Sequence, residues 1–270
     1  MGFELKQLSD VGTSNPIVAR LSLQTNELTK MFPLTNEQKE QLFGLLGMKV
    51  RDRLVNCYKI HQKIMGELIR INSIQKDDIF KNNAIYTPCV NNLRYLCESF
   101  LYEAKSTLRD FIGIFDIFYE KKFKEARFDE AYKWAEKEFG KEDILSITLK
   151  QDHDGWIRRI VTMRNAVEHP GGRSGELFIK DIMLFNKDNP PYFNPPTWKI
   201  DDEEMGLVHN DMETFIYNTL GFCEDILKIL LEKLPSKLPL IIYEIPEELR
   251  DPNCPIRLKV TLNIDEIPKV

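Results

Sequence analysis

Six consecutive residues near the middle of the chain combine side chains that can handle phosphate and protons. They are Arg164-Asn165-Ala166-Val167-Glu168-His169. An arginine offers a fixed cation with planar donors to a phosphate, and a histidine can take up and return a proton near neutral pH. Asn165 and His169 lie four residues apart, so on a helix they share one face and the amide can orient the ring. The combination suits general acid–base chemistry at a phosphodiester.

The residues after this motif predict that it closes a helix. Pro170-Gly171-Gly172 follows at once, and the residue before a proline avoids the α region. We therefore expect His169 at the helix edge with its ring turned outward. The negative end of the helix dipole and the neighbouring Glu168 both favour a protonated ring, so a proton should be available for transfer.

The charge near the motif differs from that of the whole chain. The 270 residues carry a formal net charge of −5, which argues against wholesale coating of nucleic acid. Between Trp156 and Lys180, however, the sequence contains five basic side chains and only two acidic ones. This local excess predicts a phosphate-binding patch, with Arg158, Arg159 and Arg173 as substrate-binding side chains.

Other kinds of site have no support in the sequence. The motifs of nucleotide-binding loops, zinc proteases, serine hydrolases and EF-hands are absent, and the four histidines are scattered, so we expect no metal and no cofactor. The five cysteines show no C-x-x-C spacing, and we expect reduced thiols. No apolar run reaches the roughly 18 residues of a membrane span, and the first thirty residues lack a signal-peptide run, so we expect a cytoplasmic protein without a membrane anchor.

The elements that must position the motif follow from hydrophobic period and from Pro and Gly. Four long helices are predicted. The first covers residues 36–72, and the second begins just after Thr87-Pro88 and continues for about thirty residues. The third runs from Asp152 or Asp154 to His169, and the fourth covers 210–234 and starts with capping-box spacing. Shorter helices are predicted over 128–139, ending at Gly140, and over 142–149.

Apolar stripes give the expected buried face of three of these helices. The stripes are Val50, Leu54, Cys57, His61, Ile64, Leu68 and Ile71; Leu93, Cys97, Phe100, Ala104, Leu108, Phe111, Phe115 and Phe118; and Trp156, Ile160, Met163 and Val167. Such spacing is typical of helices packed in a bundle.

Period-two patterns indicate small β elements besides the helices. A hairpin is predicted near 175–200, and strand-like runs at 241–243 and 256–262 predict a terminal pair. The predicted fold class is all-α, a helical bundle with a small β-hairpin insertion and a short β-rich C-terminal tail. We expect a lead segment over 1–35, a helical domain over 36–234, and a tail over 235–270 packed on the same domain.

The motif and its context resemble the HEPN superfamily of small helical bundles. The hallmark of that family is an Arg followed by a polar residue and, after four to six intervening residues, a His, and Arg164-Asn165-x-x-x-His169 fits it without a gap. Long helices precede the motif, the motif ends its helix, and one long helix follows, so the resemblance covers about 36–234.

The resemblance implies a metal-independent endoribonuclease in which the 2′-hydroxyl attacks the adjacent phosphate. It also implies a composite site shared by two protomers of a homodimer. Our hypothesis on this basis is a toxin or defence effector that cleaves RNA and pairs with an antitoxin or another protein. Carried over, Arg164 would hold the phosphate, His169 would transfer protons, and Asn165 would position them. In the branch paired with a nucleotidyltransferase antitoxin a Tyr stands two places after the His, where this chain has Gly171, so the resemblance does not extend to regulation through that tyrosine.

Simpler interpretations stay open beside this one. Arg164 and Glu168 have the spacing of an ordinary ion pair, His169 can be a helix C-cap whose ring binds the last carbonyls, and His61 fits a hydrogen-bonded core residue. The alternative function is a non-catalytic HEPN-like scaffold that binds RNA, a nucleotide or a protein. A third possibility is a helical interaction protein in which the motif is accidental.

Overall fold

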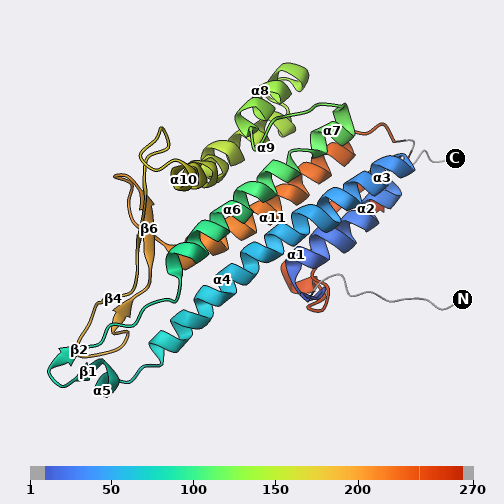
Figure 1. Cartoon of the computed structure of the whole chain (residues 1–270). Coiled ribbons are helices and arrows are strands. Elements are labelled where there is room, and N and C mark those ends of the chain that lie inside the picture. The colour runs from blue at the N-terminus through green and yellow to red at the C-terminus, as the bar shows by residue number, and fades with distance from the viewer. Residues whose placement is uncertain (1–9, 237, 264–270) are drawn as a thin grey trace, which may run out of the picture. The chain divides into compact units, whose positions relative to one another are not determined.

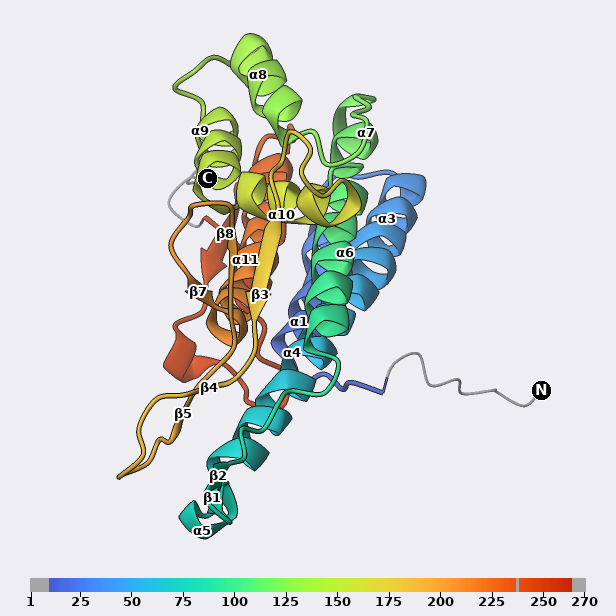
Figure 2. The ribbon, with the colours of Figure 1, turned by 60° about the vertical axis from the view of Figure 1, so that its left-hand side comes forward.

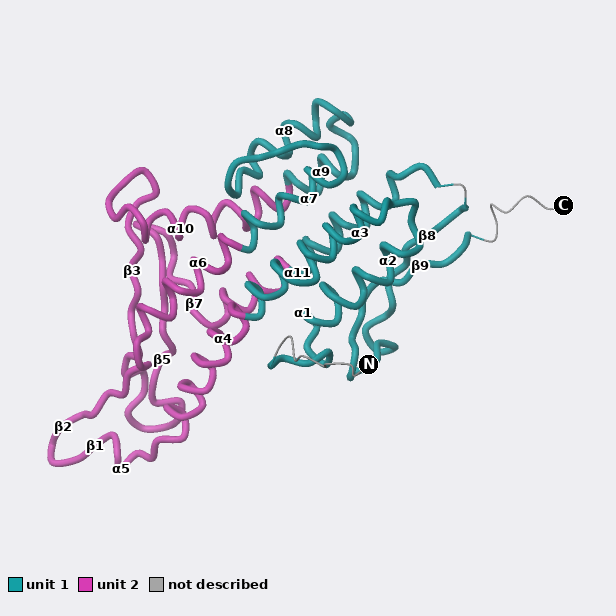
Figure 3. Tube along the Cα trace, turned by 45° about the vertical axis from the view of Figure 1, so that its right-hand side comes forward, with its two compact units in different colours: residues 1–55, 107–150, 220–270 teal, residues 56–106, 151–219 magenta. Residues whose placement is uncertain are grey.

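The computed structural model describes residues 10–236 and 238–263. The chain is mostly helical with several small antiparallel sheets, as predicted (Figure 1). It divides into two compact units, each made of segments distant in the sequence: residues 1–55, 107–150 and 220–270 in unit 1, and residues 56–106 and 151–219 in unit 2 (Figure 3). Residues 1–9 of the predicted lead segment and 264–270 of the predicted tail lie outside the described residues.

Unit 1 begins with helical structure that the hydrophobic pattern did not reveal. Helix α1 (Pro16–Val18) continues through a π-helical segment (Ala19–Gln24) into α2 (Thr25–Met31). The side chain of Asn15 accepts a hydrogen bond from the backbone of Ile17 and caps the start. Three short elements with only a few buried positions each give too weak a period to be recognised from sequence.

The predicted helix over 36–72 is confirmed, with a π-helical interruption. It consists of α3 (Asn36–Leu42), a π segment (Phe43–Val50) and α4 (Arg51–Asn72). Thr35 and Gln38 form a reciprocal capping box at its start. Every residue of the predicted seam from Val50 to Ile71 is buried, and this includes His61.

The second predicted helix is shorter than expected at its start and broken near its end. Helix α6 (Leu93–Phe111) begins five residues after Pro88, because Asn92 has a left-handed φ of 56°. A break at 112–113 separates α6 from α7 (Ile114–Tyr119). The apolar stripe is nevertheless buried from Leu93 to Phe115. Helix α8 (Phe128–Phe139) ends at Gly140, as predicted.

The third predicted helix does not start where its acidic residues suggested. Helix α9 (Ile144–Asp152), a π segment (His153–Ile157) and α10 (Arg158–Glu168) form one uninterrupted run. Asp152 is helical and accepts a hydrogen bond from the Trp156 indole at 2.6 Å instead of capping a helix. Val167, predicted to be buried, is only half-buried.

The fourth long helix also starts earlier than predicted. Helix α11 (Val208–Glu232) begins before the supposed capping box at Asn210. The carboxylate of Asp211 accepts from the indole of the fully buried Trp198 at 2.7 Å, which fixes the first turn of α11 to the insertion that precedes it.

The predicted hairpin insertion is confirmed in unit 2. Strand β3 (Leu177–Lys180) pairs antiparallel with β6 (Thr197–Ile200), and β7 (Gly206–Leu207) pairs with the other edge of β6. Further out, β4 (Met183–Leu184) pairs with β5 (Phe193–Asn194). Strand β3 contacts α10 (Figure 2).

A small structure that was not predicted follows α4. It consists of the short helix α5 (Lys76–Ile79) and the strand pair β1 (Phe80–Lys81) and β2 (Ala84–Ile85).

The predicted C-terminal strands also pair. Strand β8 (Leu240–Glu244) runs antiparallel to β9 (Leu258–Leu262), with a single 3₁₀ turn (Glu247–Leu249) between them. The tail is tied to α2 and to the preceding π segment by backbone and side-chain contacts within unit 1. The five cysteines form no disulfide. Across the described ranges, no helix combines the length and apolar character that a membrane crossing requires.

Candidate functional site

The Arg-Asn-x-x-x-His motif lies at the end of α10 in unit 2. Glu168 is the last helical residue, and His169 is the C-cap with φ −134° and ψ 69°. The backbone N–H of His169 donates to the carbonyl of Asn165 at 2.8 Å, and the N–H of Gly172 donates to the carbonyl of His169 at 2.9 Å. The predicted position of His169 at the helix edge is therefore confirmed.

The His169 ring itself is exposed. Of the residues that the structure describes, none forms a hydrogen bond or ion pair with this ring. The C-cap interpretation therefore holds for the backbone of His169 but not for its ring, which does not bind the last carbonyls of α10.

Arg164 is held on two sides by residues of the same unit. One guanidinium nitrogen lies 3.0 Å from Glu168, so the predicted ion pair is confirmed. The guanidinium carbon lies 5.5 Å from the centre of the Tyr102 ring on α6, within the range of a cation–π contact. The side chain is only 13% exposed. Its orientation is thus fixed before any ligand arrives.

Asn165 has a different partner from the one predicted. Its side-chain oxygen accepts a hydrogen bond from the Lys105 ammonium at 2.8 Å, and within the described chain no bond joins it to the His169 ring. The same ammonium lies 3.3 Å from Glu168. Lys105 therefore links the amide and the carboxylate of the motif, and the expectation that Asn165 orients the His169 ring is not met.

A groove of about 640 Å³ lies in front of Arg164, between α4, α6 and the end of α10. Helices α4 and α6 run alongside one another in Figure 1, and α10 lies across α6 in Figure 2. Its lining combines three cations, two carboxylates, two tyrosine rings, two small polar groups and three apolar side chains: Lys59, Lys63 and Arg164; Glu98 and Glu103; Tyr95 and Tyr102; Asn56 and Ser99; and Ile60, Leu96 and Val167. Such a mixture can bind phosphate through its cations and flat rings through its tyrosines.

The sequence contained a weak signal for these groove residues. Tyr95 and Tyr102 are seven residues apart, two turns of α6, and Lys59 and Lys63 are four apart on α4, so each pair shares a helix face. Both tyrosines are strongly exposed, at 69% and 47%. The apolar stripes determined which face of each helix is buried, and these residues are on the opposite side.

The three arginines predicted to bind substrate do not line this groove. Arg159 pairs with Asp211 at 3.1 Å and lies over the Phe215 ring, so it holds α10 to α11. Arg158 and Arg173 are exposed, and in the described part of the chain their side chains form no ion pair. The structure leaves these two accessible to a ligand and gives Arg159 a structural contact.

Two histidines outside the motif lie close together in the interior of unit 2. His61 on α4 is buried and hydrogen-bonded to the backbone of His209. His209 is in the first turn of α11, and in the described part of the chain its buried Nδ1 has no hydrogen-bond partner. Burial lowers the pKa of both rings from the ordinary value of 6.5, and the Glu213 carboxylate partly offsets this. His61 is thus the core residue that the sequence suggested.

Metal-binding geometry does not occur in the described residues, where no three His, Cys, Asp or Glu side chains converge.

Comparisons with protein-family models, with curated proteins and with solved structures find no match to this chain. The candidate site is therefore defined by its own geometry: an arginine held at the wall of a polar groove, and an exposed imidazole at the end of the same helix.

Proposed function

We propose that this chain is a HEPN-like helical bundle that acts as a metal-independent endoribonuclease. The observation that supports the proposal best is that Arg164 of the motif lines a groove together with Tyr95, Tyr102 and Lys63. The groove brings a phosphate-binding cation next to aromatic rings on which bases can stack. Lys63 is exposed and has no ion-pair partner among the described residues, so it can contact a neighbouring phosphate.

The proposed reaction uses the 2′-hydroxyl of RNA as the nucleophile. The bond from the 2′-oxygen to phosphorus forms as the bond from phosphorus to the 5′-oxygen breaks, which leaves a 2′,3′-cyclic phosphate and a 5′-hydroxyl. Arg164 stabilises the charge on the non-bridging oxygens. His169 takes the proton from the 2′-hydroxyl and returns it to the departing 5′-oxygen, so the proton is conserved, and the exposed ring is accessible for both steps.

The site as proposed is completed by a second copy of the chain. His169 is not among the residues that line the Arg164 groove, and a homodimer lets the ring of one protomer work with the arginine of the other. This arrangement also agrees with the composite site that the HEPN resemblance implies. A role as a toxin or defence effector in the cytoplasm, restrained by an antitoxin, is the cellular setting we propose.

The proposal is tested by incubating mixed RNA with the full chain in EDTA and comparing Arg164→Ala and His169→Ala with the wild type. We expect cleavage by the wild type, cyclic phosphate ends, and loss of at least about a hundredfold in rate for each variant, because each removes a group that acts in the transition state. Arg127→Ala and His153→Ala, which lie outside the groove, are the controls and should cleave normally.

Cleavage that persists in both motif variants, with folding intact by circular dichroism, would remove Arg164 and His169 from the mechanism. A second function is favoured by one specific observation, the pairing of Arg164 with Glu168 of the same helix at 3.0 Å, which is also an ordinary structural contact. In this alternative the chain is a non-catalytic scaffold that binds RNA, a nucleotide or a protein. Binding of RNA without any cleavage would support it.

A further inference from the structure

One carboxylate lies between the two cations of the motif region. One oxygen of Glu168 is 3.0 Å from the Arg164 guanidinium, and the other is 3.3 Å from the Lys105 ammonium. Lys105 also donates to Asn165 at 2.8 Å. The cluster of Arg164, Lys105, Asn165 and Glu168 thus holds two positive charges and one negative charge that belongs to the protein itself.

The position of Glu168 affects how a ligand can reach Arg164. Tyr102 covers one face of the guanidinium, and Glu168 pairs with the donors of one nitrogen at its edge. Glu168 is more exposed than its partner, at 39% against 13%, so it can move while Arg164 stays in place. A phosphate that enters the groove and takes the same donors meets a carboxylate of like charge, which must first withdraw.

We propose that Glu168 is an internal competitor for phosphate at Arg164, and that Lys105 retains the carboxylate when a phosphate displaces it. The inference rests on the proposed function insofar as Arg164 is the phosphate-binding residue. Lys105 is a positioning residue in this scheme. Its ammonium already contacts Glu168, and its bond to Asn165 keeps it in place while the carboxylate shifts from one cation to the other.

The test measures binding rather than cleavage. The probe is a fluorescent 2′-O-methyl oligoribonucleotide, which has no 2′-hydroxyl to attack phosphorus, and its affinity is followed by anisotropy at several salt concentrations. Glu168→Gln keeps the shape and a hydrogen-bonding oxygen but removes the charge. We expect about threefold to tenfold tighter binding, the size expected when one like charge is removed beside a partly exposed phosphate.

The matched control is Glu67→Gln. Glu67 is also in a helical ion pair, with Arg70 at 2.7 Å, and lies outside the groove. The Glu67→Gln change alters the net charge by the same amount as Glu168→Gln. Because it lies outside the groove, the affinity of this variant for the oligoribonucleotide should stay at the wild-type value. An equal gain in Glu67→Gln would mean that net charge alone is responsible and would overturn the competitor role of Glu168.

A second pair of variants tests Lys105. Lys105→Met should weaken binding severalfold when Glu168 is present, because the displaced carboxylate then has no other cation. The loss should be smaller when residue 168 carries the Glu168→Gln change, because no carboxylate remains to be retained. Equal losses in both backgrounds would show that Lys105 does not hold the carboxylate.

Arg164→Ala separates this inference from the proposed function. Weaker binding and a shallower salt dependence are expected for this variant, because a phosphate contact is lost. No change would mean that the groove is not the phosphate site, and the proposed function would fail. Weaker binding by Arg164→Ala together with no gain by Glu168→Gln would keep the phosphate site and refute only the competition.

Discussion

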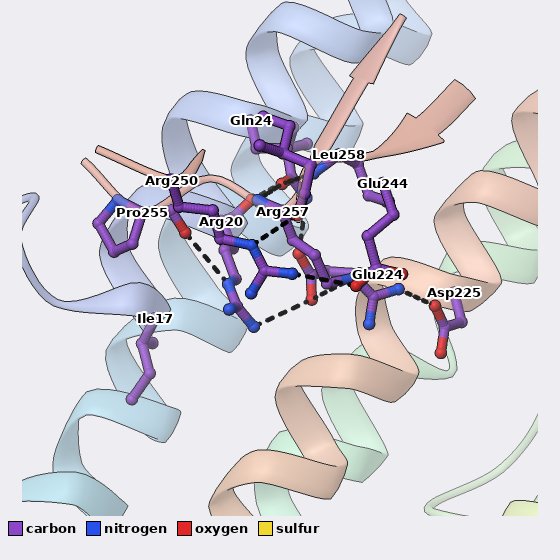
Figure 4. Close-up of polar contacts among 12 residues, drawn as sticks. Ile17, Arg20, Gln24, Glu224, Asp225, Glu244, Arg250, Pro255, Arg257 and Leu258 are labelled. Carbon is purple, nitrogen blue, oxygen red and sulfur yellow. Dashed lines mark hydrogen bonds and ion pairs between the residues drawn. The ribbon is translucent and has the colours of Figure 1, made fainter. Parts of the chain in front are cut away.

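At the scale of single residues, the buried side chain of Gln24 makes three polar contacts within unit 1. Its side-chain oxygen accepts hydrogen bonds from the backbone N–H groups of Arg257 and Leu258, both at 2.6 Å, and its nitrogen donates to Glu224 at 2.8 Å (Figure 4). Gln24 is 1% exposed. One amide thus joins the π segment before α2, helix α11 and the start of β9.

The carboxylate of Glu224 in this network is almost fully buried. Burial raises its pKa, although the nearby Arg257 and Arg20 act in the opposite direction. Each arginine lies 3.6 Å from it, and Arg257 also pairs with Asp225 (Figure 4). The charge therefore has partners on several elements, and among the described residues the amide of Gln24 supplies its one direct hydrogen bond at 2.8 Å.

Replacement of Gln24 by Ala should reduce the free energy of unfolding by about 2–4 kcal/mol, because two backbone donors and a buried carboxylate oxygen lose their partner. Urea denaturation followed by circular dichroism measures the effect. Gln41→Ala is the control, since Gln41 is exposed and its single bond to Glu37 is 3.3 Å long, and it should stay within about 0.5 kcal/mol of the wild type. A similarly small effect of Gln24→Ala would mean that water satisfies these groups.

At the scale of elements, the turn from α10 to β3 determines where His169 lies. The backbone of Gly171 donates to the carbonyl of Gly175 at 3.2 Å, and that of Gly175 donates to Gly172 at 3.1 Å. Gly175 has a φ of 76°, and a Cβ there would overlap the carboxylate of Asp201. Asp201 accepts from the backbone of Glu176 at 2.8 Å. The turn thus needs a residue without a side chain at 175.

Gly175→Ala should destabilise the protein by about 1–3 kcal/mol, because it combines an unfavourable φ with a clash against Asp201. In the proposed enzyme it should also lower the cleavage rate, since the turn carries the backbone bond to His169. Gly155→Ala, at a helical position where a Cβ meets no atom within 4 Å, should be neutral or slightly stabilising. Thermal unfolding of both variants tests this, and equal behaviour would contradict it.

At the scale of the whole molecule, stability should depend on pH through the buried histidines. His61 and His209 have pKa values lowered by burial, so the unfolded chain binds protons more readily than the folded one. The negative charge of Glu213 acts on both rings in the opposite direction and raises their pKa values, and Asp211 does the same for His209. The two neutral rings therefore contribute fully to the free energy of unfolding above about pH 6.5, the ordinary pKa of histidine. This contribution is lost as the pH falls toward the lower pKa values that the rings have in the folded chain.

We therefore expect the free energy of unfolding to fall between pH 7 and pH 5.5, as measured by urea denaturation at each pH. The double variant His61→Gln and His209→Gln should show a smaller fall, because neither ring remains to be protonated. A wild-type fall that survives in the double variant would assign it to other groups.

The period of the apolar residues determined the helices and their buried faces. The seam from Val50 to Ile71 and the stripe from Leu93 to Phe115 are buried as predicted, because burial on one face of a helix leaves a mark at fixed spacing. The motif at the end of α10 was likewise readable, since Pro170 and the glycines after it stop a helix by their own backbone preferences.

Only the tertiary structure decided the partners of the motif. Lys105 is 60 residues from Asn165, and no local pattern connects it to α10. The position of its ammonium depends on how α6 and α10 are rotated and where they cross, which is set by many packing contacts together. The same holds for Arg159, which the sequence predicted to bind substrate and which forms an ion pair with Asp211 in the structure. Local preferences fix an element within a few residues, whereas a polar contact is formed only within about 3 Å and needs the whole fold to bring its two groups together.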